Sequence, residues 1–219
     1  MLLPANLDRF VAETAPAHDD IQERMATHAA DGGFPIIGQV AGSYLWSLAR
    51  TTNAESVFEF GSGFGYSASW FLKGMSASGT IVLTEIDADE LELAKTYLSE
   101  AGTADNAVFE HGDAMEIIEK YDGPFDVVLI DHGKTAYADA FRRVIDKVRP
   151  GGVVVADNIM DGPVWYEDLL PYLETDDGDP GDDASAGILA YLRAVMSHPD
   201  CHSMVLPIGN GLAVTTKLE

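Results

Sequence analysis

The sequence predicts an α/β fold in which helices cover both faces of a doubly wound, mostly parallel, Rossmann-like sheet. Short, strongly apolar segments alternate with helical segments from residue 56 onward, and the connections between them are short. Such strand–helix alternation is typical of parallel sheets. At 219 residues and 47% hydrophobic content, the chain fits one domain over 1–219. We divide it into a helical segment, 1–52, and a Rossmann-like core, 53–219.

The elements follow in order along the chain. The first 52 residues look helical, with interruptions at Pro16 and at GGFPIIG (32–38). The core then begins with SVFEFG (56–61), an apolar run of the kind that forms a strand buried on both faces. By the same pattern, further strands are expected at 80–87, 106–113, 125–131 and from 152 onward, with helices at 66–75, 89–101 and 136–148.

The C-terminal part predicts a different strand pairing. Residues 174–183 (ETDDGDPGDD) read as an acidic loop, either plainly solvated or a lid over a site. A helix near 184–197 precedes two last strands, HSMVLPI and LAVTTKL. Gly209-Asn210-Gly211 between them has the turn chemistry of a hairpin, so this pair should be antiparallel.

Charge is the extreme feature of the composition. There are 36 acidic and 13 basic residues, a net charge of −23, and the acids are scattered along the chain. We interpret them as a solvated coat suited to a very salty cytosol, which is a halophilic character. Such a field repels phosphate backbones and anionic membranes, so we expect no membrane partner and consider nucleic acid an improbable one. A signal peptide and an apolar span are not evident, and we expect a cytoplasmic location.

A glycine-rich turn follows the first strand and predicts a nucleoside site. Gly61, Gly63 and Gly65 have the spacing G-x-G-x-G, which lets the backbone approach a ligand closely. Glu59 ends the strand, and Glu85, some twenty residues after the glycines, is placed to accept hydrogen bonds from a ribose diol. The turn contains no Lys or Arg and no triphosphate-binding motif. S-adenosylmethionine fits these features, with a carboxylate available for its amine.

Two later strands end in oxygen-bearing side chains. Asp131 follows FDVVLI, and Asp157–Asn158 follow GVVVA. Ligands of open α/β sheets bind outside the carboxyl ends of such strands, and these oxygens are suited to Mg²⁺, Mn²⁺ or Ca²⁺. Lys134 follows Asp131 by three residues, which would put an amine beside the metal. The pattern predicts an enzyme that ionises a hydroxyl.

These segments together resemble the metal-dependent O-methyltransferases, the catechol and caffeoyl-CoA family of class I S-adenosylmethionine-dependent enzymes. The motifs that carry the resemblance are VFEFGSGFGYSA (57–68), LTEID (83–87), LIDHGK (129–134), ADN (156–158) and LPIGNGLAV (206–214). The resemblance implies a seven-stranded sheet of order 3-2-1-4-5-7-6 with strand 7 antiparallel. Members of the family are commonly dimers, so a homodimer is possible.

The resemblance also implies a role for each matching residue. The catalytic base would be Lys134, and the metal ligands would be Asp131, Asp157 and Asn158. The residues implied at the cofactor are Ile37, Glu59, Gly61, Tyr66, Ser67, Glu85, Ile86, Asp113, Ala114, Asp131 and His132. Ile86 and the Gly112–Ala114 turn would lie at the adenine.

The leading hypothesis is therefore an O-methyltransferase (EC 2.1.1) that acts on a small catechol-like or vicinal-diol acceptor. One alternative is an O-methyltransferase for a hydroxylated tRNA base, which would require a basic groove. Another is a non-catalytic nucleoside-binding protein, which the Asp131–Lys134 spacing disfavours. A nicotinamide-dependent oxidoreductase is disfavoured by the glycine spacing. An acyl-CoA acceptor is not supported, because residues 159–183 differ from the plant caffeoyl-CoA enzymes.

Overall fold

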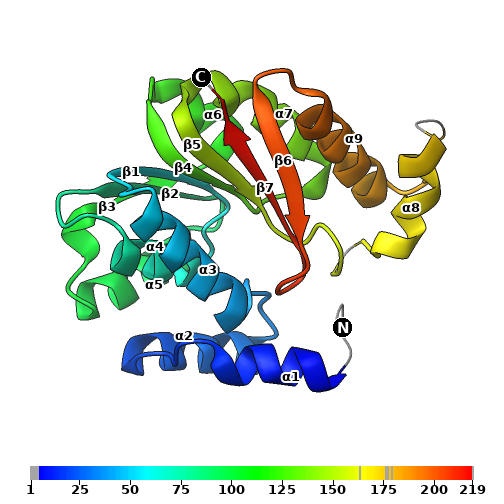
Figure 1. Ribbon diagram of the computed structural model, residues 1–219. Coiled ribbons are helices and arrows are strands. Elements are labelled where there is room, and N and C mark those ends of the chain that lie inside the picture. The colour runs from blue at the N-terminus through cyan, green and yellow to red at the C-terminus, as the bar shows by residue number, and fades with distance from the viewer. Residues whose placement is uncertain (1–4, 163, 176–177, 179, 219) are drawn as a thin grey trace.

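The computed structural model describes residues 5–162, 164–175, 178 and 180–218. Its sheet has the order β3-β2-β1-β4-β5-β7-β6, which confirms the predicted topology (Figure 1). The parallel strands are β1 (Ser56–Phe60), β2 (Thr80–Glu85), β3 (Ala107–His111), β4 (Phe125–Ile130) and β5 (Val148–Ala156). The hairpin strands β6 (Cys201–Leu206) and β7 (Leu212–Lys217) pair antiparallel, and β7 also pairs antiparallel with β5.

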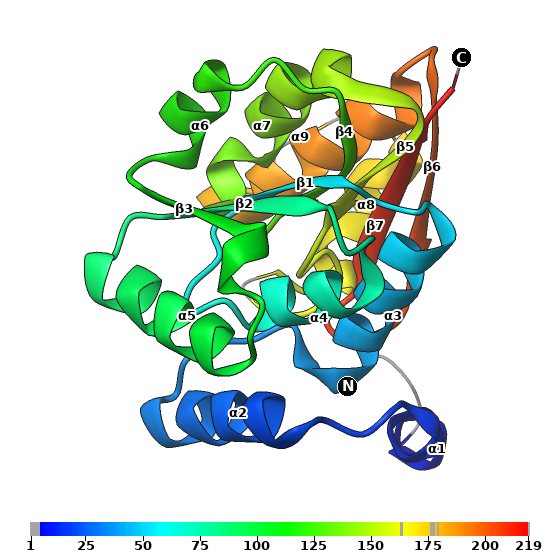
Figure 2. The same ribbon diagram turned by 90° about the vertical axis from the view of Figure 1, so that its left-hand side faces the viewer.

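Helices cover both faces of the sheet and leave the strand ends free (Figure 2). One face is covered by α3 (Gly38–Thr51), α4 (Tyr66–Gly74) and α5 (Ala88–Glu100), whose apolar side chains share one core cluster with the strands. The other face carries α6 (Ala114–Ile117), α7 (Tyr137–Val144) and α9 (Asp183–Ser197) over a second cluster. Burial on both faces explains why most side chains of the central strands are apolar.

The N-terminal helices lie outside these layers. The first, α1 (Ala5–Thr14), contacts α3, and α2 (Asp20–Gly32) packs across α4 and α5. Asp19 begins α2 through a capping box with Gln22, and the helix ends at Gly33, which has φ +66°. The predicted interruptions at Pro16 and at 32–38 therefore coincide with the ends of these helices.

Three local predictions differ from the structure. The fifth strand begins at Val148 rather than 152, because residues 149–151 extend it past the register shift against β4. The expected helix 136–148 is shorter, with 3₁₀ turns on either side of α7. Helix α8 (Tyr166–Thr175), which contains Pro171, is not expected from the sequence. Within the loop 174–183, residues 176, 177 and 179 lie outside the described part, so the lid hypothesis is untested.

The strand register brings three chemically important positions to one edge. Phe60 pairs with Ile130, and Ile130 pairs with Ala156. Gly61, Asp131 and Asp157 each follow one of these residues and therefore emerge side by side at the carboxyl ends of the strands. Among the described helices, none is long and apolar enough to cross a membrane.

Candidate active site

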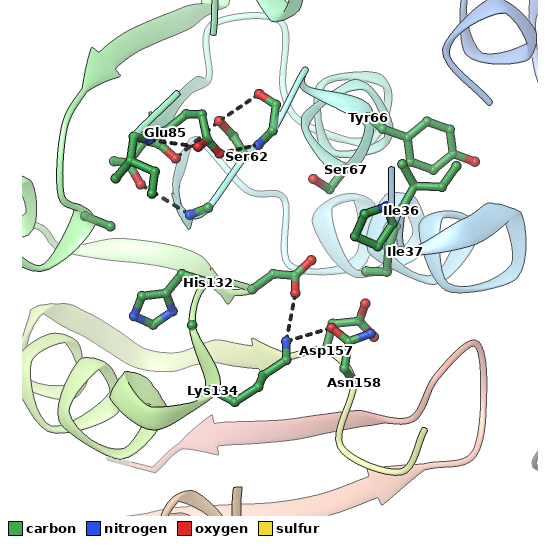
Figure 3. A pocket seen from close by; sticks show the side chains of 18 of the residues that line it. Ile36, Ile37, Ser62, Tyr66, Ser67, Glu85, His132, Lys134, Asp157 and Asn158 are labelled. Carbon is green, nitrogen blue, oxygen red and sulfur yellow. Dashed lines mark hydrogen bonds and ion pairs between the residues drawn. The ribbon is translucent and has the colours of Figure 1, made fainter. Parts of the chain in front are cut away.

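A cavity of about 600 Å³ lies at the carboxyl ends of β1, β4 and β5 (Figure 3). It brings together residues separated by more than 150 positions in the sequence. Of the predicted site residues, all but Glu59 line it: Ile37, Gly61, Tyr66, Ser67, Glu85, Ile86, Asp113, Ala114, Asp131, His132, Lys134, Asp157 and Asn158. Both halves of the predicted site, the glycine turn and the strand-end oxygens, thus face one space.

The glycine turn approaches β4 so closely that a side chain would not fit. Gly61 has φ +79°, and a Cβ added there would lie 2.7 Å from the carbonyl oxygen of Asp131. Gly65 has φ +83° and precedes α4. These positions require glycine for the backbone path, which keeps the floor of the cavity open beside the start of a helix.

At one end of the cavity, a carboxylate holds the turn in shape. Glu85 accepts hydrogen bonds from the backbone N–H of Gly63 at 2.8 Å and of Ile86 at 2.8 Å. The Ile86 side chain is 74% exposed at the rim. Asp113 caps α6 by accepting from Met115 N at 2.8 Å. This end offers an acid and an apolar side chain, the groups that suit a ribose and a flat ring.

Glu59 lies behind the turn and is fully buried. Neither of its carboxylate oxygens has a hydrogen-bond partner within 3.5 Å. Burial raises the pKa of Glu59 to about 8, and the Ser67 hydroxyl offsets only part of this effect. A buried carboxyl without a partner is costly, so this group is suited to receive a cationic ligand through the adjacent turn.

At the other end, Lys134 joins the two strand ends. Its Nζ donates to Asp131 Oδ1 at 3.2 Å and to Asn158 Oδ1 at 2.7 Å (Figure 3). The Lys134 side chain is only 11% exposed. Two of the three predicted metal ligands therefore already converge on one positive charge.

The third predicted ligand, Asp157, is 1% exposed, and its Oδ1 has no partner. Burial and the neighbouring Asp131 carboxylate raise the pKa of Asp157 to about 8. Asn158 has φ +56°, a conformation that Asn adopts more readily than most residues. No group of three or more His, Cys, Asp and Glu side chains among the described residues is placed to hold a metal. The predicted set has two acids and an amide.

His132 supplies a neutral aromatic wall. Its ring stacks on Tyr137 at an interplanar angle of 11°, and neither ring nitrogen has a hydrogen-bond partner. Burial lowers the pKa of His132 to about 4, with the Lys134 ammonium acting in the same direction. The ring is therefore uncharged at neutral pH and lies against the cavity as a flat, weakly polar surface.

Sequence reasoning missed two residues that support the site. Tyr137 hydroxyl receives a hydrogen bond from Lys134 and donates to the Asp157 backbone carbonyl at 3.2 Å. Its position three residues after Lys134 was the available signal, since such spacing puts side chains on one helical face. His18 bonds the Tyr66 hydroxyl at 2.7 Å. No pattern in the sequence links residues 48 positions apart.

The comparisons with known proteins agree with this geometry. The sequence model described as O-methyltransferase matches residues 13–218. The chain belongs to this O-methyltransferase family. It is 28% identical over 169 residues to a catechol O-methyltransferase of Niastella koreensis, covering 74% of this chain and 76% of the relative. It is 25% identical to caffeoyl-CoA O-methyltransferase 1 of Arabidopsis thaliana, covering 100% of this chain and 87% of the relative.

A solved structure has the same fold. The O-methyltransferase TomG from Streptomyces achromogenes, in complex with SAM, superposes with a TM-score of 0.82 at 24% identity. The match covers 98% of this chain and 96% of TomG. The present protein is thus an O-methyltransferase with the seven-stranded sheet of its family, as the sequence predicted.

Glu59 in this O-methyltransferase gives a testable dependence of stability on pH. Its pKa rises from 4.5 to about 8 on folding, so the folded protein holds the proton more tightly. Stability from this group is complete below 4.5 and is lost as pH rises through about 8. In urea unfolding of the ligand-free protein, the free energy of unfolding should decline less between pH 4.5 and about 8 in Glu59→Gln than in the wild type. The difference should reach up to a few kcal/mol. Glu55→Gln, at an exposed position, is the control; parallel profiles for wild type and Glu59→Gln would refute the assignment.

Proposed function

We propose that this O-methyltransferase transfers a methyl group from S-adenosylmethionine to a hydroxyl of a small catechol-like or vicinal-diol acceptor, with the help of a divalent metal ion. One observation carries the proposal. Lys134, Asp131 and Asn158 form a hydrogen-bonded set in the same cavity as the glycine turn. A base, a set of hard oxygen ligands and a nucleoside site would then lie within reach of one bound acceptor.

S-adenosylmethionine fits the glycine end. Glu59, Ser67 and Tyr66 would hold the methionine part, and Glu85 would bind the ribose diol. Ile86, Asp113, Ala114 and His132 would surround the adenine, while Ile37 and Gly61 would contact the cofactor through the backbone. Because burial keeps the Glu59 carboxyl protonated in the free protein, binding of the cofactor ammonium there should release a proton. SAM in the TomG structure supports this choice.

A divalent cation such as Mg²⁺, Mn²⁺ or Ca²⁺ fits the strand-end set. Asp131, Asp157 and Asn158 would hold it, and the orphaned Oδ1 of Asp157 would gain the partner that it lacks. When bound, such an ion supplies Lewis acidity that makes a hydroxyl easier to ionise. Lys134 donates to two of these oxygens, so its amine would lie beside the ion.

Lys134 is then the general base. Its amine is held at the start of η3 (Lys134–Ala136) beside the strand ends, where it would accept the proton of the acceptor hydroxyl. Asp131 orients the amine, and the Tyr137 hydroxyl accepts a further hydrogen bond from it. Methyl transfer leaves a neutral thioether, so the chain needs no general acid. The residues act by positioning the reactants and moving one proton.

The cofactor assignment has a direct test. Isothermal titration should show binding of S-adenosylhomocysteine in the micromolar range, about −8 kcal/mol, and no comparable heat with NAD⁺. Repeating the titration in two buffers with different ionisation enthalpies should reveal the proton that Glu59 releases. Tight binding of NAD⁺ without a response to S-adenosylhomocysteine would refute the proposed cofactor.

A further inference from the structure

The cavity carries an unequal balance of charge. Four carboxyl groups line it, those of Glu85, Asp113, Asp131 and Asp157, whereas Lys134 is the one basic side chain of Lys or Arg type among the described lining residues. Lys134 is itself engaged by Asp131 and Asn158. The described part of the cavity therefore offers no cation that is available to a negatively charged acceptor.

The other Lys and Arg side chains that the structure describes do not line the cavity, and most of them form ion pairs outside it. The chain has 13 Lys and Arg residues, and most of them pair with acids outside the cavity. These ion pairs are Arg9–Glu13, Arg24–Glu100, Lys73–Asp19, Lys95–Glu92, Lys120–Glu110, Arg142–Asp139, Arg143–Glu119 and Arg149–Asp126. Lys147 and Lys217 donate instead to backbone carbonyls. None of these side chains lines the cavity.

The segment that follows the strand-end set adds more negative charge. Residues 161–168 contain Asp161, Glu167 and Asp168 but no Lys or Arg. Gly162 of this segment lines the cavity and lies against the side chain of Asn158. Glu167 and Asp168 are exposed, so their negative charges add to the field outside the protein.

Binding of the metal ion and the cofactor would not turn the negative charge in and around the cavity into a positive one. A dication would offset Asp131 and Asp157, and the sulfonium and ammonium of S-adenosylmethionine would be offset by its own carboxylate and that of Glu59. Lys134 adds at most one positive charge. Glu85 and Asp113 remain, together with the acids of 161–168 and an overall charge of −23. A field of one sign in and around a cleft raises or lowers the local concentration of a charged ligand.

We infer that the site selects its acceptor by charge. Catechols with an ammonium group or no charge are methylated in preference to those with a carboxylate, sulfate or phosphate. This inference rests on the proposed function, because it specifies the acceptor of the same site. It also predicts that acyl-CoA acceptors, which carry phosphates, are poor substrates of this chain.

Three catechols with closely similar skeletons test the inference: dopamine, the ethylcatechol that lacks its amine, and dihydrocaffeate. At low ionic strength, kcat/KM should fall in that order, by about tenfold between the cationic and the anionic compound. In about 1 M KCl, where the Debye length is about 3 Å, most of this difference should disappear. A neutral sugar at the same osmolarity is the control for KCl.

Two variants at one position in the cavity test the charge selection by changing the protein instead of the acceptor. Ile36 lines the cavity on the side of Ile37 and Tyr66, away from Glu85 and His132 (Figure 3). Ile36→Lys should raise the dihydrocaffeate-to-dopamine ratio of kcat/KM by about fivefold, whereas the neutral Ile36→Gln should leave the ratio unchanged. The ratio is measured within one variant, so a general loss of activity does not affect it.

The possible results distinguish a failure of the inference from a failure of the proposed function. Dihydrocaffeate used as well as dopamine by the wild type would overturn the inference and leave the proposed function standing. A preference for dopamine that persists unchanged in KCl would also overturn it, since discrimination would then be steric. No transfer to any of the three catechols would overturn the proposed function and the inference together.

Discussion

Replacing Lys134 with alanine should lower kcat by about 10²- to 10⁴-fold, the range that general bases contribute. The Nζ lies 2.7 Å from Asn158 Oδ1 and 3.2 Å from Asp131 Oδ1, and none of the other described residues that line the cavity is a Lys or Arg that could replace it. Cofactor affinity should stay within about twofold, because the proposed cofactor contacts come from the glycine turn and from Glu85. Steady-state kinetics and S-adenosylhomocysteine titration of the same preparation measure the two effects.

Lys120→Ala is the matched control for that experiment. Lys120 is a 59%-exposed lysine that pairs with Glu110 on the surface, so its loss should change neither kcat nor cofactor affinity. Equal losses of kcat and of cofactor affinity in Lys134→Ala would show that the residue is structural rather than catalytic.

Asp157→Ala should abolish metal-dependent activity, with a loss of about 10³-fold in kcat/KM, equivalent to several kcal/mol of charge stabilisation. The variant should still fold, because Oδ1 of Asp157 is buried without a partner and its removal relieves that cost. Chelation of the wild type with EDTA should produce a similar loss, reversed by added Mg²⁺. Asp157→Ala should gain little from the same Mg²⁺.

Asp139→Ala controls for the loss of one negative charge. Asp139 is 68% exposed and pairs with Arg142 on α7, so this variant should keep wild-type activity and metal response. Full activity in Asp157→Ala, or activity in the wild type that survives exhaustive chelation, would contradict the proposed metal role. Circular dichroism of both variants shows whether a loss of activity reflects unfolding.

The carboxylates at the strand ends could be predicted from the sequence, because the direction of the strands determines where these side chains lie. An apolar run followed at once by Asp131, and another followed by Asp157, places both carboxylates at one sheet edge once the strands are parallel neighbours. The glycine turn was predictable for a related reason. A Cβ at Gly61 would collide with the backbone of Asp131, just after β4, so a glycine is needed where the two chain segments come so close.

Other features depend on tertiary contacts that leave no local pattern. The bridge from Lys134 to Asn158 spans 24 positions, and the bond from His18 to Tyr66 spans 48. Helix α8 was missed because Pro171 lies within it and the neighbouring sequence is acidic, although Leu169 buries its side chain in the core. In that segment packing outweighs local propensity.

Methyl transfer to a simple catechol, measured with and without free divalent metal, tests the central claim most directly. Labelled S-adenosylmethionine, catechol and Mg²⁺ should yield a mono-O-methylated product, and EDTA in place of Mg²⁺ should reduce the yield to near background. Transfer at the same rate in EDTA would contradict a metal at Asp131, Asp157 and Asn158. A labelled product that carries its methyl group on carbon or nitrogen would contradict hydroxyl chemistry at this site.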